Sequence, residues 1–248
     1  LDSGTPGGEI AILYRVNSHS RLLEEALRKA DIPHVIVGGI RFFERAEIKD
    51  ILSYLKVIYN PDDDIAFDRV VNMPRRGVGR KSMMRLKGMA ERSGQSLYFT
   101  LLTGDLSDFP SVSQRGLAEF LEIIEEYRAQ AENEDVGQII PGIIRDSGYL
   151  QKLEEDGSVE ARARLENLSE LVNSGIEFAN THPDNPGLGD YLAETSLLSE
   201  VDNYEGDEER VSLMTVHSAK GLEFDVVYVC GLEEGLFPIA RAMESTAE

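Results

Sequence analysis

Segments with the pattern of β-strands occur only near the two ends of this 248-residue chain. Two apolar runs lie near the N-terminus, at residues 10–14 and 35–37, and two lie near the C-terminus, at residues 211–214 and 226–229. Between them, over residues 44–195, apolar side chains recur at helical spacing. Because a sheet needs several strands side by side, we predict one sheet assembled from both ends of the chain, around a helical insertion of about 150 residues.

The first 39 residues have the pattern of a strand–helix–strand unit. Ile10–Tyr14 is apolar throughout, as expected for a buried strand of a parallel sheet. Asn17 is predicted to cap the helix that follows, and Val35–Val37 forms a second strand that ends at Gly38-Gly39. This arrangement is the building unit of parallel sheets. The apolar stripe of the helix comprises Leu22, Leu23, Ala26, Leu27 and Ala30.

Apolar stripes at helical spacing indicate several helices in the middle of the chain. They lie within residues 48–58, 65–71, 117–127 and 159–178. The acidic stretch 203–210 is predicted to be the linker that returns to the sheet. Proline and glycine predict breaks between helices at Asn60-Pro61, Phe109-Pro110, Pro141-Gly142 and His182-Pro183.

The composition disfavours several classes of protein. A formal net charge of −20 argues against broad, non-specific binding to nucleic acid, where neutralisation of phosphates dominates affinity. No apolar run approaches the roughly 18 residues of a membrane span, so no membrane partner is expected. Cys230, the single cysteine, leaves no internal disulfide and is predicted to be a core residue. A reducing, cytoplasmic location is therefore expected.

A local basic segment stands out against this acidic background. Residues 69–90 carry seven basic side chains and no acidic one. Within it, Pro74–Gly79 is predicted to be a glycine-hinged turn that leads into a basic helix. Glycine lets the backbone approach a partner closely, and amides at a helix N-terminus bind phosphate, so the turn is a candidate clamp on a DNA backbone. A plain junction between two helices is the alternative. The residues of the candidate clamp are Arg76, Gly77, Gly79, Arg80 and Lys81.

The ten residues Thr215–Phe224 combine a hydroxyl, an imidazole, an ammonium, a glycine and a carboxylate between two strand-like runs. Loops at the ends of buried strands are where α/β folds usually carry their chemistry. Five kinds of functional group exceed what a solvated turn needs, so we predict a ligand-binding loop. The alternative is an ordinary polar surface connection.

Other kinds of site find little support in the sequence. The four histidines are scattered without metal-ligand spacing, and no nucleophile elbow is present. Gly77–Ser82 lacks the Gly-Lys-Ser/Thr ending of a phosphate loop and follows no strand. Phe42-Phe43 offers two rings that could stack on bases, but anchoring of the adjoining helix is the favoured interpretation.

Five segments together resemble the UvrD/PcrA/Rep family of superfamily 1 DNA helicases, which move 3′ to 5′ on single strands. The segments follow one another in the order of the family and span essentially the whole chain. They are residues 10–17, 38–50, 76–79, 215–224 and 231–238.

The resemblance implies an α/β fold with a divided domain. Residues 1–39 and 205–248 correspond to the second RecA-like motor domain, 2A, and residues 40–204 correspond to the helical 2B domain inserted in it. It also implies that the chain stops short of the arginine motif that ends 2A. The first motor domain, with its phosphate loop and its Asp-Glu metal-binding pair, is absent from this sequence. No complete catalytic site is therefore expected in this chain.

The resemblance implies roles for single residues of the candidate ligand-binding loop. Glu223 would accept a hydrogen bond from the ribose of ATP, and Lys220 and Gly221 would lie on the nucleotide side of the cleft. Thr215 and His217 would face DNA or couple the DNA and ATP sites. The loop would thus connect two ligands.

Further contacts implied by the resemblance involve both domains. Arg15 and Asn17 would contact single-stranded DNA, and Arg76–Gly79 would contact duplex DNA. The implied partners are single-stranded and duplex DNA, the first motor domain of the same polypeptide, and repair proteins. ATP and Mg²⁺ would serve the full-length protein, with the Mg²⁺ ligands outside this chain.

We therefore expect the C-terminal part of an ATP-dependent 3′–5′ DNA helicase of repair or replication, inactive on its own. One alternative is a non-catalytic module that binds DNA or a protein through its helical domain. Another is part of a helicase–nuclease. An upstream phosphate-loop domain would argue against the first alternative, and a downstream nuclease domain would favour the second.

Overall fold

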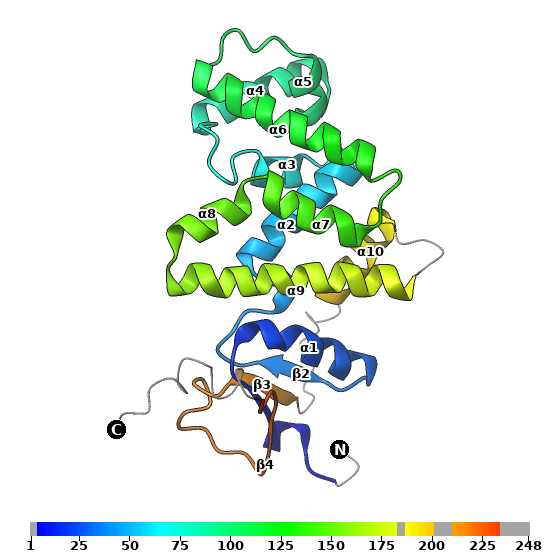
Figure 1. The fold of residues 1–248 in the computed structure, drawn as a ribbon, viewed down its shortest axis with the longest axis vertical. Helices are drawn as coiled ribbons and strands as arrows, with labels where there is room; N and C mark the ends of the chain where they lie inside the picture. The colour runs from blue at the N-terminus through cyan, green and yellow to red at the C-terminus, as the bar shows by residue number, and fades with distance from the viewer. Residues whose placement is uncertain (1–3, 183–186, 201–209, 234–248) are drawn as a thin grey trace. The chain divides into compact units, whose positions relative to one another are not determined.

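The computed structural model describes residues 4–182, 187–200 and 210–233 (Figure 1). The chain divides into two compact units, Leu1–Arg45 with Asn203–Glu248, and Ala46–Asp202. In the described residues the first unit holds a parallel sheet and the second is helical, which confirms the predicted α/β fold with a helical insertion. The 2A and 2B boundaries stay predictions.

Two predicted features lie outside the described residues. They are residues 203–209 of the acidic linker and Glu234–Pro238 of the last family-like segment. Across the described part of the chain, no helix combines the length and the apolar character needed to cross a membrane.

Parallel strands from both ends of the chain form the described sheet. Their order is β2-β3-β1-β4. The C-terminal strand β3 therefore lies between the two N-terminal strands, with Leu213 beside Ile12 of β1 and Ile36 of β2. This topology confirms the prediction of one sheet built from both ends. The strands are β1 (Ile10–Tyr14), β2 (His34–Ile36), β3 (Val211–Thr215) and β4 (Val226–Val229).

Helix α1 (Ser20–Lys29) packs on one face of this sheet. Leu23 and Leu27 contact the core, but Leu22 is 54% exposed, because the predicted stripe is wider than the face that meets the sheet. Asn17 does not cap α1 as predicted. It begins a 3₁₀ turn, Asn17–His19, which leads into the helix and leaves His19 at the N-cap position. The core comprises Ile10, Tyr14, Val211 and Leu213.

The aromatic pair after β2 is buried. Phe42 is 1% exposed and Phe43 is 9% exposed, in the 3₁₀ turn η3 (Phe42–Glu44). Their rings meet edge to face at 5.1 Å, and the Arg45 guanidinium lies 5.2 Å from the centre of the Phe42 ring. Neither ring is open for stacking on a base, so the apolar-anchor interpretation is confirmed.

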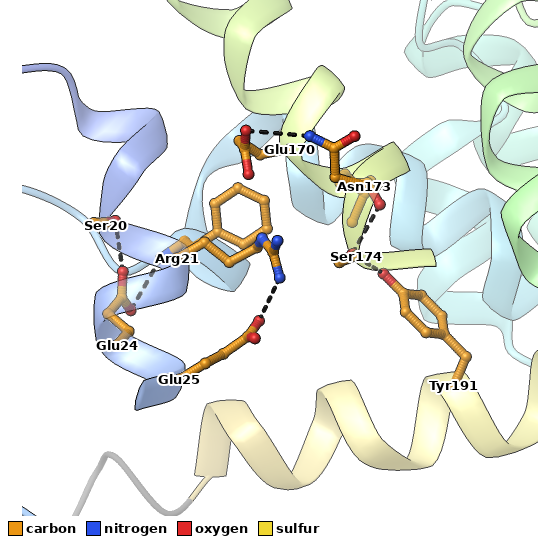
Figure 2. Close-up of polar contacts among 10 residues, drawn as sticks. Ser20, Arg21, Glu24, Glu25, Glu170, Asn173, Ser174 and Tyr191 are labelled. Carbon is orange, nitrogen blue, oxygen red and sulfur yellow. Dashed lines mark hydrogen bonds and ion pairs between the residues drawn. The ribbon is translucent and has the colours of Figure 1, made fainter. Parts of the chain in front are cut away.

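A buried polar cluster joins residues 40–45 to α1 and to the loop before it. Arg45 Nη2 donates to the carbonyl of Asn17 at 3.0 Å and to Oγ of Ser20 at 2.7 Å. Figure 2 shows the Ser20 hydroxyl beside Glu24, to which it donates at 2.6 Å. Burial, reinforced by the Glu24 charge, raises the pKa of Tyr14 to about 12. These bonds fix the loop after β1 against residues 40–45.

The described helical unit is arranged around α2, which contacts α3, α6, α7, α9 and α10 (Figure 1). The apolar stripes predicted α2, α3, α6 and α9, and the basic helix is α4. Helices α5, α7, α8 and α10 were not separately predicted. The bounds are α2 (Ala46–Tyr59), α3 (Asp64–Val70), α4 (Arg80–Ser93), α5 (Leu97–Thr103), α6 (Ser111–Gln130), α7 (Val136–Asp146), α8 (Tyr149–Asp156), α9 (Val159–Thr181) and α10 (Leu188–Glu200).

Two predictions for single residues are wrong. Pro141 lies inside α7 and not at a break. Helix α7 packs along α9, and a Cβ atom at Gly142 would come within 2.8 Å of the Tyr127 ring, so tertiary packing holds the helix across the proline. Cys230 is half-buried, not a core residue, because it follows β4, a strand that is exposed along most of its length.

Buried polar contacts tie α2 to its neighbours. Asp50, 5% exposed, accepts from Nε of Arg69 on α3 and from the hydroxyl of Tyr149 on α8, each at 2.8 Å. Burial, reinforced by the Asp50 charge, raises the pKa of Tyr149, so this hydroxyl stays protonated and donates. Glu47 accepts from Nδ2 of Asn167 on α9 at 2.5 Å. The helices are thus joined by paired polar groups as well as by apolar contacts.

Candidate functional site

The carboxyl ends of parallel strands lie at one edge of a sheet, and here three of them lead into loops that carry candidate site residues or glycines. Arg15–Asn17 follows β1, Gly38-Gly39 follows β2, and the turn Val216–Gly221 follows β3. A Cβ atom at Gly38 would lie 3.2 Å from Oγ of Ser218, so the second and third loops touch. We call these three loops the carboxyl edge.

Internal hydrogen bonds hold the turn after β3. The hydroxyl groups of Thr215 and Ser218 lie 2.9 Å apart, and Oγ1 of Thr215 accepts from the Ser218 amide at 3.2 Å. The Ala219 amide donates to the Thr215 carbonyl at 3.1 Å. The turn ends at Gly221 with φ +86°, a conformation that favours glycine. The Thr215 hydroxyl therefore caps the turn.

Arg15 and His217 meet across the carboxyl edge. Nη1 of Arg15 lies 2.9 Å from Nδ1 and 3.4 Å from Nε2 of His217. The two residues are 202 positions apart in sequence, yet β1 and β3 are neighbouring strands. Asn17 is exposed on the same loop, two residues after Arg15. The structure thus brings together Arg15 and His217, two of the residues predicted to contact single-stranded DNA.

The residues predicted to face ATP lie further along the same loop. Lys220, Gly221 and Glu223 are exposed. Neither Lys220 nor Glu223 has a side-chain hydrogen bond or ion pair with any described residue, so their charged groups are open to a ligand. Their predicted roles are not tested by this arrangement and stay predictions.

The basic turn of the helical unit is held rigidly. Oδ1 of Asn72 accepts from the amides of Arg76 at 2.7 Å and of Val78 at 3.1 Å. Gly77 has φ +76°, and its carbonyl accepts from Oγ of Ser113 on α6 at 2.8 Å. This turn places the N-terminus of α4 directly after Gly79.

Most cations of the basic segment are engaged inside the protein. Arg69 pairs with Asp50, Arg85 donates to the Asp108 carbonyl, and Lys87 pairs with Asp68 at 2.7 Å. The Arg76 guanidinium donates to the Ser147 carbonyl at 2.6 Å and to the Pro74 carbonyl at 3.2 Å. The cations that remain exposed, without a partner among the described residues, are Arg75, Arg80 and Lys81.

Arg75 is a functional candidate that the sequence-based selection missed. It adjoins Arg76 in the basic segment, and periodicity gives no reason to separate the two. The structure separates them, because Arg76 is half-buried and bonded while Arg75 is exposed. The selected residues thus form two sites, the carboxyl edge in one unit and the basic turn in the other. No group of three or more potential metal ligands occurs among the residues with described positions.

Comparison with known proteins decides the family. The sequence profile of the family described as UvrD-like helicase C-terminal domain matches residues 2–248. The chain belongs to this family. Its similarity covers both units and all residues of the two candidate sites. The relatives are helicases by name, so the alternative of a non-catalytic module is not favoured.

Among the relatives of this UvrD-like helicase C-terminal domain are three proteins named ATP-dependent DNA helicase PcrA. The protein of Leuconostoc citreum is 42% identical over 95% of this chain. Those of Staphylococcus epidermidis and Staphylococcus aureus are 39% and 38% identical over 98% and 97% of it. The chain spans only 32–33% of the length of these relatives.

Proposed function

We propose that the chain is the C-terminal part of an ATP-dependent 3′–5′ DNA helicase. The observation that carries the proposal is the arrangement of the carboxyl edge. Arg15 and His217 lie within hydrogen-bonding distance, and the turn that carries His217 continues to the exposed Lys220 and Glu223. One loop can therefore respond to both a DNA strand and a nucleotide. The names of the relatives support this interpretation.

For ATP, the chain supplies one wall of a binding site. Glu223 offers an open carboxylate that can accept a ribose hydroxyl, and Lys220 offers a cation for the phosphates. Gly221 lets the backbone pass close to the nucleotide. ATP hydrolysis would supply the free energy for movement along DNA. The Mg²⁺ ligands and the phosphate loop belong to the first motor domain, a partner that we place outside these 248 residues.

For single-stranded DNA, we propose Arg15, Asn17 and His217 as the contact residues. Arg15 is half-buried, and Asn17 and His217 are exposed. Groups on loops fixed by a buried sheet suit a motor that releases and remakes single contacts. Thr215 has a different role in this proposal, since its hydroxyl is engaged with Ser218. It shapes the turn that presents His217.

For duplex DNA, we propose the basic turn of the helical unit. Arg80 and Lys81, with the amides at the start of α4, face a DNA backbone, and Arg75 adds a third cation. Gly77 and Gly79, which have no side chains, let the backbone of the turn come close to the DNA backbone. Arg76 acts by holding the turn through its bond to Ser147.

The 248-residue chain alone is expected to show no DNA-stimulated ATP hydrolysis, because its sequence contains no phosphate loop. Phosphate release is measured with and without oligo(dT), beside a complete PcrA relative as the positive control. Turnover by the chain that rises with added DNA would contradict the proposed division of the ATP site.

Arg80→Ala with Lys81→Ala is expected to weaken binding to duplex DNA and to lower the slope of log K against log salt by about 2, one unit for each phosphate that is no longer neutralised. Fluorescence anisotropy with a labelled duplex measures the affinity over a series of salt concentrations. The series starts at low salt, because the net charge of −20 opposes binding.

A matched control removes the same charge elsewhere in the helical unit. Arg92→Ala with Lys152→Ala changes two exposed cations that lie outside the basic turn. This variant is expected to keep the salt slope of the unmodified chain. Equal slopes for the two double variants would show that net charge, and not the basic turn, governs binding.

A further inference from the structure

We infer that Asn72 is a positioning residue of the basic turn. Its side-chain oxygen fills a ring of backbone amides that would otherwise bind an anion, and so directs a DNA phosphate to the amides of residues 79–81. This inference rests on the proposed function of the basic turn and refines it, because it assigns the phosphate to particular backbone groups and names the side chain that places them.

Two amides of the basic turn converge on one atom of Asn72. Oδ1 accepts from the amide of Arg76 at 2.7 Å and from that of Val78 at 3.1 Å. An amide nitrogen could accept neither bond, so the two donors identify this atom as the oxygen. Gly77, which lies between the donors, has φ +76°. Amides that converge in this way form a nest, a concavity that binds anions.

A neutral oxygen already occupies this nest, so a phosphate cannot use the same two amides. The next amides along the chain, those of residues 79–81, donate to no acceptor among the described residues. A Cβ atom added at Gly79 would meet nothing within 4 Å, so the space beside this part of the turn is open. The amides at the start of α4 are therefore the ones left for a phosphate, beside the side chains of Arg80 and Lys81.

The position of these amides depends on Asn72. Val78 is 2% exposed, and a buried amide that loses its acceptor is costly, so the turn would shift to satisfy it. On the other side, Oγ of Ser113 donates to the Gly77 carbonyl at 2.8 Å and lies 2.9 Å from Oγ of Ser82 on α4. Removal of the Asn72 side chain would keep every cation of the turn and change only the placement of its backbone.

The first test needs no DNA. Hydrogen exchange of the Arg76 and Val78 amides is measured by NMR in the 248-residue chain. Asn72→Ala is expected to speed both about 10-fold, and Asn72→Asp, which keeps the acceptor, to leave them within about 3-fold of the unmodified chain. The Ala66 amide, which donates to Oδ1 of Asp63 at 2.9 Å, is the internal control and should not change. Unchanged exchange in Asn72→Ala would overturn the inference and leave the proposed helicase function standing.

The second test measures binding to a labelled duplex over a series of salt concentrations, with folding of each variant checked by circular dichroism. Asn72→Ala is expected to weaken binding about 5-fold to 10-fold, because the turn is no longer held in its binding arrangement. The slope of log K against log salt should stay that of the unmodified chain, because no cation is lost. In the background of Arg80→Ala with Lys81→Ala, Asn72→Ala is expected to cost less than about 2-fold.

A matched control changes another asparagine of the helical unit. Asn60 is exposed, and its Oδ1 accepts from the Asp62 amide at 3.2 Å, outside the basic turn. Asn60→Ala is expected to leave both the duplex affinity and the salt slope unchanged. An equal loss in the two asparagine variants would show that Asn72 has no special role in placing the turn.

The outcomes separate the inference from the proposed function. If Arg80→Ala with Lys81→Ala weakens binding but Asn72→Ala does not, the inference fails alone. An equal effect of Asn72→Ala with and without the two cations would also overturn it, since Asn72 would then not act through them. If the unmodified chain does not bind the duplex, or if loss of the two cations has no effect, the proposed role of the basic turn fails together with the inference.

Discussion

Gly116→Ala is expected to lower the free energy of unfolding of the helical unit by about 3 kcal/mol. Gly116 on α6 faces the basic turn, where a methyl group would overlap the carbonyl oxygen of Arg76 and lie 2.8 Å from its Cβ. The neighbour is backbone, and Asn72 and Ser113 hold the turn in place, so the overlap cannot be relieved by a side-chain rotation. Urea unfolding followed by far-UV circular dichroism measures the loss.

The matched control is the same substitution at another helical glycine. Gly88 on α4 has only Nη1 of Arg92 near its added Cβ, at 3.5 Å, which is ordinary contact. Gly88→Ala is therefore expected to stabilise the protein by about 0.5–1 kcal/mol through helix propensity. Equal effects of the two substitutions would mean that α6 does not press on the basic turn. Duplex binding should fall in Gly116→Ala and remain unchanged in Gly88→Ala.

Asp50→Ala is expected to cost about 3 kcal/mol of unfolding free energy. The substitution leaves the buried Tyr149 hydroxyl without its acceptor and removes the partner of Arg69. The Arg69 side chain is 38% exposed, so water can solvate its charge. Most of the lost unfolding free energy is therefore expected to come from the buried Tyr149 hydroxyl. The measurement is again the urea midpoint, with the slope checked for two-state behaviour.

An exposed ion pair of the same helical unit provides the comparison. Asp68 pairs with Lys87 at 2.7 Å, with side chains 44% and 46% exposed. Asp68→Ala is expected to cost about 0.5 kcal/mol, as surface pairs do. The loss of unfolding free energy for Tyr149→Phe is expected to lie between those of Asp50→Ala and Asp68→Ala, since this substitution removes the donor and leaves Asp50 paired with Arg69. A loss for Asp50→Ala no greater than for Asp68→Ala would contradict the structural role given to the buried cluster.

Sequence patterns predict the architecture because burial leaves long, repeated signals. The continuous apolar run Ile10–Tyr14 and the stripes of α2, α6 and α9 indicate which surfaces face the core, and the order of these signals predicts a divided sheet domain. The predictions for Asn17 and Pro141 are wrong because local residue preferences leave out the tertiary contacts that decide where a helix begins or ends. A 3₁₀ turn precedes α1, and packing on α9 carries α7 past its proline.

The candidate sites are only partly predictable. Patterns of residue type select the loops that carry Arg15, His217 and Arg76, and the family resemblance assigns their roles. No sequence pattern distinguishes Arg76, bonded to Ser147, from exposed Arg75. The contact between Arg15 and His217 also needs the structure, because it depends on strand order over 202 positions of sequence.

The position of β3 between β1 and β2 affects the order in which the two units can fold. Within these 248 residues, β1, α1 and β2 are synthesised before β3, and among the described strands neither β1 nor β2 has a hydrogen-bonded neighbour until residues 211–215 follow. The helical unit Ala46–Asp202 emerges in between, and its helices pack mainly on one another. The helices can therefore form before β1 and β2 pair with β3. The sheet is completed after the helical unit, by pairing between residues far apart in sequence, which is intrinsically slow.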